Sequence, residues 1–154
     1  MEKSEELSHE LLIMMNQLIN ENILYVGGYR LGPVRIIGSE KTFPLPLELD
    51  KIMDEFISYY NDLMRKNITM KDIAYMHITY ENIHPFPDGN GRTGRLLINY
   101  LLLLKNQFPI VIPVSQRKQY LDYMENNNYD GLTSLFENLQ KEEIERIHDF
   151  DEMI

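Results

Sequence analysis

Residues 84–95 read HPFPDGNGRTGR and separate two stretches whose apolar residues recur at helical spacing. Pro85 and Pro87 cannot continue the first helix, because proline lacks a backbone N–H and clashes with the preceding turn. The run DGNG at 88–91 is a turn sequence that leads directly into the second stretch, and its glycines let a ligand approach the backbone closely. We therefore expect two helices joined by a tight loop, with the loop at the N-terminus of the second helix.

The charged residues of this segment predict a phosphate-binding site. Free amides at a helix N-terminus bind anions, and Arg92 and Arg95 lie three residues apart on one helix face, where their guanidinium groups suit phosphate oxygens. Asp88 would repel phosphates unless a hard cation such as Mg²⁺ bridged them. His84, which is neutral near pH 7, can accept a proton from a hydroxyl. Each residue alone is more typical of a structural role, but their conjunction indicates nucleotidyl or phosphoryl transfer.

Outside this segment, most of the chain also has helical periodicity. We expect helices over 5–20, 47–65, 69–82, 91–105, 116–126 and 131–147. Residues 29–46 carry two short apolar runs around Gly38 and Ser39, which predicts a surface β-hairpin. The acidic tail from Asp149 is expected to fray. The sequence thus predicts a single, mainly α-helical domain over residues 1–154 with one small β-hairpin.

Composition narrows the classes of function. The 154 residues are 44% apolar, which is enough for one core. A net charge of −9 disfavours a nucleic-acid binder, and the absence of cysteine excludes disulfides, cysteine zinc sites and a thiol nucleophile. The longest apolar stretch, 96–104, is too short to span a bilayer, and the N-terminus lacks a signal-peptide core. We therefore expect a cytoplasmic protein with no nucleic-acid or membrane partner.

The segment HPFPDGNGRTGR resembles the signature of Fic-domain proteins, His-x-Phe-x-Asp/Glu-Gly-Asn-Gly/Lys-Arg, and matches it at every defined position. Residues 28–39 resemble the segment that leads into the target-binding flap of that family, and residues 110–123 resemble the stretch that shapes its adenine pocket. The resemblance covers about residues 7–140. It implies a Fic-type helical core with a β-hairpin flap. It also implies Mg²⁺-dependent transfer of AMP from ATP to a Ser, Thr or Tyr hydroxyl of a target protein, with release of pyrophosphate.

The resemblance also implies a role for each matching residue. His84 resembles the general base, Phe86 the buried anchor of the loop, and Asp88 the Mg²⁺ ligand. The implied phosphate-binding residues are Gly89, Asn90, Gly91, Arg92 and Arg95, the last holding the γ-phosphate. The implied adenine contacts are Tyr120 and Asn128, and the implied flap residues are Val34, Arg35, Ile36, Ile37, Gly38, Thr42 and Phe43. Many relatives have two successive aromatic residues where this chain has Tyr120 and Leu121, so the nucleotide preference stays open.

Many members of this family are inhibited by a helix with a Ser/Thr-x-x-x-Glu-Gly/Asn motif, whose glutamate pairs with the second arginine of the signature. The one match in this chain is TSLFEN at 133–138. Because it falls in a predicted core helix, we expect Glu137 to point away from Arg95. Inhibition by a partner chain or through a homo-oligomer stays open. We likewise expect His77, two turns before His84, to be a core or loop-bracing residue.

Two other functions stay open from the sequence. One is an enzyme on the same scaffold that transfers another nucleotide or another phosphate-containing group, or that removes AMP. The other is a non-catalytic module that binds nucleotide or a partner protein without turnover. The intact His84, Asp88, Arg92 and Arg95 favour an enzyme.

Overall fold

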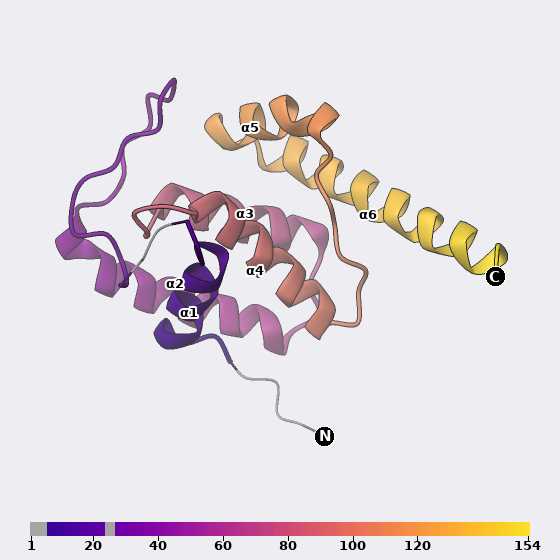
Figure 1. Cartoon of the computed structure of the whole chain (residues 1–154), viewed down its shortest axis with the longest axis horizontal. Helices are drawn as coiled ribbons and strands as arrows, with labels where there is room; N and C mark the ends of the chain where they lie inside the picture. The colour runs from indigo at the N-terminus through magenta and orange to yellow at the C-terminus, as the bar shows by residue number, and fades with distance from the viewer. Residues whose placement is uncertain (1–5, 24–26) are drawn as a thin grey trace.

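The computed structural model describes residues 6–23 and 27–154. Within them the chain forms six α-helices: α1 (His9–Ile19), α2 (Leu49–Arg65), α3 (Met70–Ile83), α4 (Asn90–Leu104), α5 (Arg117–Glu125) and α6 (Tyr129–Glu152). Short 3₁₀ turns at Pro46–Glu48 and Val114–Gln116 precede α2 and α5. Helix α3 packs against α2, α4 and α6 and is the centre of the bundle, while α1 packs against α2 and α4 (Figure 1). No helix in the described part of the chain is long and apolar enough to cross a membrane.

The helix boundaries follow the local capping chemistry. Ser8 accepts a hydrogen bond from the backbone N–H of Leu11 and starts α1. Thr69 and Asp72 form a reciprocal capping box at the start of α3. All six predicted helices are present, but α6 continues to Glu152, so residues 149–152 are helical rather than frayed. A fixed start for α3 matters because its other end carries His84 into the candidate site.

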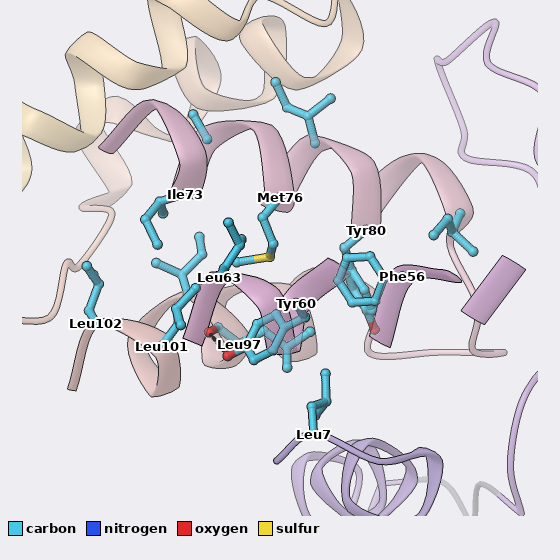
Figure 2. Packing of buried hydrophobic residues seen from close by; sticks show 14 of the residues in the cluster. Leu7, Phe56, Tyr60, Leu63, Ile73, Met76, Tyr80, Leu97, Leu101 and Leu102 are labelled. Carbon is cyan, nitrogen blue, oxygen red and sulfur yellow. Dashed lines mark hydrogen bonds between the residues drawn. The ribbon is translucent and has the colours of Figure 1, made fainter. Parts of the chain in front are cut away.

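The core lies around the inward face of α3. Its largest fully buried side chains are aromatic: Tyr60, Tyr80, Phe86 and Phe136. Figure 2 shows Met76 and Tyr80 of α3 reaching toward residues of α2 and α4, and Tyr60 Oη donates a hydrogen bond of 2.8 Å to the Leu97 carbonyl. Burial of each such side chain contributes about 1.5–3 kcal/mol to stability. This packing makes the α3–α4 pair a firm support for the loop between them.

The predicted β-hairpin is wrong. Residues 27–46 leave the bundle and double back (Figure 1), and the described chain has no strands. The turn is closed by a hydrogen bond from Ser39 N to Ile36 O. Pro33 and Pro44 lack the N–H groups that a strand ladder needs, and the segment is held instead by side chains. The guanidinium of Arg30 donates to the carbonyls of His84 and Pro44.

Candidate active site

His84 occupies the junction between α3 and its following loop. Its backbone is left-handed, with φ 51° and ψ 60°, and its N–H donates to the Tyr80 carbonyl at 3.1 Å. Its own carbonyl accepts a hydrogen bond of 2.8 Å from Arg30 Nε. The Phe43 ring lies 4.9 Å from the imidazole, centroid to centroid. A helix end, an arginine and an aromatic ring thus hold His84, and a non-glycine residue with positive φ is typical of a constrained functional position.

The environment of His84 keeps its imidazole neutral. Burial lowers the pKa of His84 below its ordinary value, and the positive charge of Arg30 lowers it further. A lowered pKa means that the uncharged ring, which can accept a proton, predominates at neutral pH. The side chain is only partly exposed. His84 therefore has a constrained geometry and an uncharged ring that can accept a proton.

The loop after His84 is held by the side chain of Asn90. Asn90 Oδ1 accepts from the Phe86 N–H at 2.9 Å, and Asn90 Nδ2 donates to the Phe86 carbonyl at 2.8 Å. Phe86 is fully buried, as the sequence predicts for a loop anchor. The amide of Asn90 was expected among the phosphate-binding groups, but it is turned into the loop. Asn90 can offer a phosphate only its backbone N–H, as the first residue of α4.

Gly89 allows the chain to turn into α4. Its φ is +76°, which L-residues rarely adopt. A Cβ at this position would also come within 2.9 Å of the Asn20 side chain. Glycine is thus required here by backbone conformation and by space. The turn leaves the first N–H groups of α4 at the surface of the loop, where an anion can bind.

Two asparagines of α1 hold the other side of the loop. The Asp88 carbonyl accepts from Asn16 Nδ2 at 2.9 Å and from Asn20 Nδ2 at 3.3 Å. Arg92, expected to bind phosphate, donates to Ile19 O at 3.1 Å and to Asn20 Oδ1 at 2.8 Å. Sequence reasoning missed both asparagines, which are fully buried at i and i+4 in an otherwise apolar helix stripe. Two polar residues within an apolar stripe were the sequence feature that could have identified them.

Arg95 is the arginine that faces open space. Its Nη1 lies 3.1 Å from where a Cβ of Gly91 would be, so the guanidinium folds back over the N-terminal turn of α4. There it borders a cavity of about 290 Å³ between α4, α5 and the 36–43 segment. The cavity is lined by Ile36, Ile37, Gly38, Ser39, Lys41, Phe43, Glu81, Gly91, Arg95, Tyr120, Leu121, Asp122, Met124 and Glu125. Of the two predicted phosphate-binding arginines, the structure brings Arg95 to the cavity and ties Arg92 to α1.

The two residues predicted to contact adenine lie in different places. Tyr120 lines the cavity but is buried, and its Oη shares a hydrogen bond of 2.5 Å with His77 Nε2. Burial lowers the pKa of His77 to about 3, so His77 is a neutral core residue, as expected. Asn128 does not line the cavity. Its side chain caps α6 by accepting from the Gly131 N–H at 2.8 Å, and it borders a separate hollow.

The segment over the cavity, residues 34–43, is held by two side chains that sequence reasoning missed. Lys41 Nζ donates to Asn82 Oδ1 at 2.6 Å, to the Met124 carbonyl at 2.5 Å and to Asn127 Oδ1 at 3.0 Å. Glu125 accepts hydrogen bonds from Ser39 Oγ at 2.7 Å and from the Glu40 N–H at 3.3 Å. Its predicted flap residues Arg35, Ile36, Ile37, Gly38 and Thr42 are exposed, while Val34 and Phe43 are half-buried. The segment therefore presents an exposed backbone next to His84.

Glu137 lies on the exposed side of α6. Its neighbour Phe136 is buried against the His77 ring, with centroids 6.0 Å apart. Among the described residues no ion pair joins Glu137 to Arg95. The arrangement agrees with the expectation that the core needs the apolar face of this helix and turns Glu137 away.

His84 thus precedes a helix N-terminus, and Arg95 of that helix borders the cavity. Residues 6–102 match the family model described as Fic/DOC family, so the chain belongs to this family. Curated relatives include the protein adenylyltransferase Fic of Drosophila persimilis, 34% identical over 108 residues, which cover 70% of this chain and 19% of that protein. A probable protein adenylyltransferase of Aquifex aeolicus is 30% identical over 101 residues, covering 66% of this chain and 31% of that protein.

Solved structures show the same fold. Fic-1 from C. elegans superposes with a TM-score of 0.85 over 99% of this chain and 46% of that chain, at 21% identity. A Fic domain containing signaling protein from Bacteroides thetaiotaomicron gives a TM-score of 0.75 over 87% of this chain and 59% of that chain, at 23% identity. The chain therefore spans about a fifth to a third of the curated relatives named above and about half of these solved chains.

Proposed function

We propose that this chain is a protein adenylyltransferase, which transfers AMP from ATP to a hydroxyl of a target protein. The observation that carries the proposal is the junction between α3 and the loop that follows it. A neutral, constrained His84 directly precedes a helix N-terminus over which Arg95 is folded. The names of the curated relatives, protein adenylyltransferase, support the same reaction. They also favour an enzyme over a module that only binds nucleotide.

In the proposed reaction, the hydroxyl oxygen of the target attacks the α-phosphorus of ATP. A bond forms between that oxygen and the phosphorus, the bond from the phosphorus to the bridging oxygen breaks, and pyrophosphate leaves. His84 Nε2 takes the hydroxyl proton, a step that contributes about 10²–10⁴-fold to the rate. The N–H groups at the start of α4 and the Arg95 guanidinium bind the phosphate oxygens and stabilise the charge that develops on them.

The family implies Mg²⁺, and the residues present fit that ion. Mg²⁺ is typically bound by one or two carboxylates together with the phosphates of its substrate. The Asp88 carboxylate is half-exposed and lies 3.8 Å from the Arg92 guanidinium, and the two asparagines bind only its backbone carbonyl, so its exposed side is accessible to a cation. Asp88 would hold the ion, which would neutralise negative charge on the phosphates.

The cavity divides into two ends that suit the two ends of ATP. Gly91 and Arg95 border it at the N-terminus of α4, where phosphates bind, and Leu121 and Met124 of α5 offer an apolar surface for a base. The exposed backbone of residues 34–43 can pair with an extended segment of the target and bring a hydroxyl toward His84. Such pairing uses main-chain groups, so the target need not carry a particular sequence.

The proposal is tested by incubating the full chain with Mg²⁺, a cell lysate and, in separate reactions, ATP, CTP, GTP or UTP labelled at the α-phosphate. We expect labelled protein with ATP, and none when His84→Ala replaces the wild type. Labelling by another nucleotide in preference to ATP would assign a different nucleotidyl group to the same site. Tight ATP binding with no labelled protein in any reaction would contradict an enzymatic function.

A further inference from the structure

Glu81 is a buried carboxyl that the proposed mechanism does not use. It lies on α3, one helical turn before His84, and borders the cavity. Its Oε1 is buried and has no hydrogen-bond partner in the described residues. Glycine at position 94 of α4 makes room for this oxygen, because a Cβ there would overlap it. An unpaired buried polar atom costs free energy, so its retention beside a cavity indicates a ligand contact.

The side chains of Glu81, from α3, and of Arg95 lie against the same face of α4. The Glu81 oxygen lies against Gly94, and the Arg95 guanidinium lies against Gly91. Gly91 and Gly94 are three residues apart, and residues at this spacing are neighbours on a helix surface. The carboxyl therefore borders the end of the cavity where phosphates are proposed to bind.

Near Glu81, Lys41 and His77 have hydrogen-bond partners, while the buried Tyr80 hydroxyl has none among the described residues. Lys41, from the segment over the cavity, donates to three oxygens. His77 is neutral and is bonded to Tyr120 of α5, and Tyr80 is buried on α3 itself. Helix α6 contributes the apolar ring of Phe136 on the far side of His77. The remaining charged group that acts on Glu81 is Arg95 of α4.

These surroundings keep the carboxyl close to half-protonation at neutral pH. Burial raises the pKa of Glu81 to about 7, against the opposing effect of the positive charges of Arg95 and Lys41. An anion bound at Arg95 would offset those positive charges and add a repulsive negative one. Both effects favour the neutral acid.

We propose that Glu81 is a phosphate-binding residue that acts in its protonated form, so that nucleotide binding is coupled to uptake of a proton. The carboxyl O–H then donates a hydrogen bond to a phosphate oxygen, in a place where a carboxylate would repel it. The inference rests on the proposed function in that it assumes that this cavity takes the phosphates of a nucleotide. The inference adds proton uptake to nucleotide binding, and proton uptake can be measured without any AMP transfer.

The test is calorimetric titration of the full chain with Mg²⁺ and a non-hydrolysable ATP analogue, at pH 7, in two buffers of different ionisation enthalpy. Wild type should take up about half a proton per nucleotide, because a group with a pKa of about 7 is half-ionised at that pH. Its affinity should fall about tenfold between pH 6 and pH 8. The isosteric Glu81→Gln variant should show neither effect. Glu142→Gln, which removes a carboxylate at an exposed position of α6 away from the cavity, should behave as wild type.

The outcomes separate this inference from the proposed function. Equal proton uptake by wild type and Glu81→Gln would overturn the inference, while His84-dependent AMP transfer would still support the function. Proton-coupled binding without any transfer would support the inference and contradict the function.

A second probe is inorganic pyrophosphate, with the Glu81 carboxyl carbon followed by NMR. Its titration midpoint should rise when pyrophosphate is added, and an unchanged midpoint or a failure of pyrophosphate to bind would overturn the inference.

Discussion

The loop between α3 and α4 and the segment over residues 27–46 lie beside each other at the candidate site. Both are held by distant residues, but the α3–α4 loop also contains a short-range side-chain clamp of its own. In the α3–α4 loop, the Asn90 side chain binds the backbone of Phe86, four residues away. The 27–46 segment relies on Lys41 and Glu125, whose contacts join residues 41 and 83 to 86 positions apart. Short-range contacts of the first kind are visible in a sequence motif. Contacts of the second kind depend on how the bundle packs.

The largest expected effect comes from the α3–α4 loop. His84→Ala should lower the rate of AMP transfer by about 10²–10⁴-fold, because it removes the proton acceptor. Affinity for the ATP analogue should change little, since His84 is placed to meet the target hydroxyl and the phosphates bind at α4. Single-turnover labelling and calorimetry measure the two quantities separately. His148→Ala, at an exposed position of α6, is the matched control. Transfer by His84→Ala at the rate of the control would exclude His84 as the base.

The next prediction tests whether Asn90 holds the loop. Asn90→Ala leaves the N–H and the carbonyl of buried Phe86 without partners, which should lower the free energy of unfolding by about 1–3 kcal/mol for each group. Urea denaturation measures this loss. Asn126→Ala is the control, because Asn126 makes an exposed hydrogen bond to the Asp122 carbonyl. If the two variants were equally stable, the loop would not depend on the Asn90 clamp.

A smaller and more local effect is expected in the other region. Lys41→Met keeps the length of the side chain but removes its three hydrogen bonds, so residues 34–43 should separate from α5. Target modification should fall about tenfold, equivalent to about 1.4 kcal/mol, with global stability little changed. Hydrogen–deuterium exchange should rise in residues 34–43 and stay unchanged in residues 84–90. Equal increases in both segments would show that the two regions are not independent, and Lys118→Met at an exposed site of α5 gives the baseline.

The smallest effect concerns pH. Because burial lowers the pKa of His84, the base stays neutral until the pH falls below the ordinary histidine value of about 6.5. The acid limb of the kcat/KM profile should therefore lie below pH 6.5. The same pKa shift makes the free energy of unfolding fall as the pH falls. The unfolded chain binds the proton more readily than the folded chain, so the contribution of His84 to stability is lost below about pH 6.5. An acid limb above pH 6.5 would show that a different group is titrating.

The sequence predicted the parts of the molecule that depend on neighbouring residues. The DGNG turn at the start of α4 is such a part, and it is present where it was expected. The hairpin was predicted from β-propensity, but the described segment has only a turn bond from Ser39 N to Ile36 O and no strand ladder. Arg30 and Lys41 instead bind distant carbonyls, and these contacts hold the segment in a conformation without strands.

The residues of the candidate site also fall into two groups, those predictable from the local sequence and those that depend on packing. Gly91 and Arg95 were predicted from one contiguous segment and both border the cavity, while His84 and Gly89 of that segment lie in the turns before α4. The partners of Arg92 could not be predicted, because they lie on α1, more than 70 residues away. The same holds for Glu81, whose position beside Arg95 depends on the packing of α3 against α4.

The most direct test of the proposed adenylyltransferase function follows the α-phosphate and the γ-phosphate of ATP separately. The full chain is incubated with Mg²⁺ and a target-containing lysate, once with ATP labelled at the α-phosphate and once with ATP labelled at the γ-phosphate. The account predicts that label from the α-phosphate becomes covalently attached to protein and that label from the γ-phosphate leaves as pyrophosphate. Attachment of the γ-label would show phosphoryl transfer, and it would contradict the assignment of this site as an adenylyltransferase.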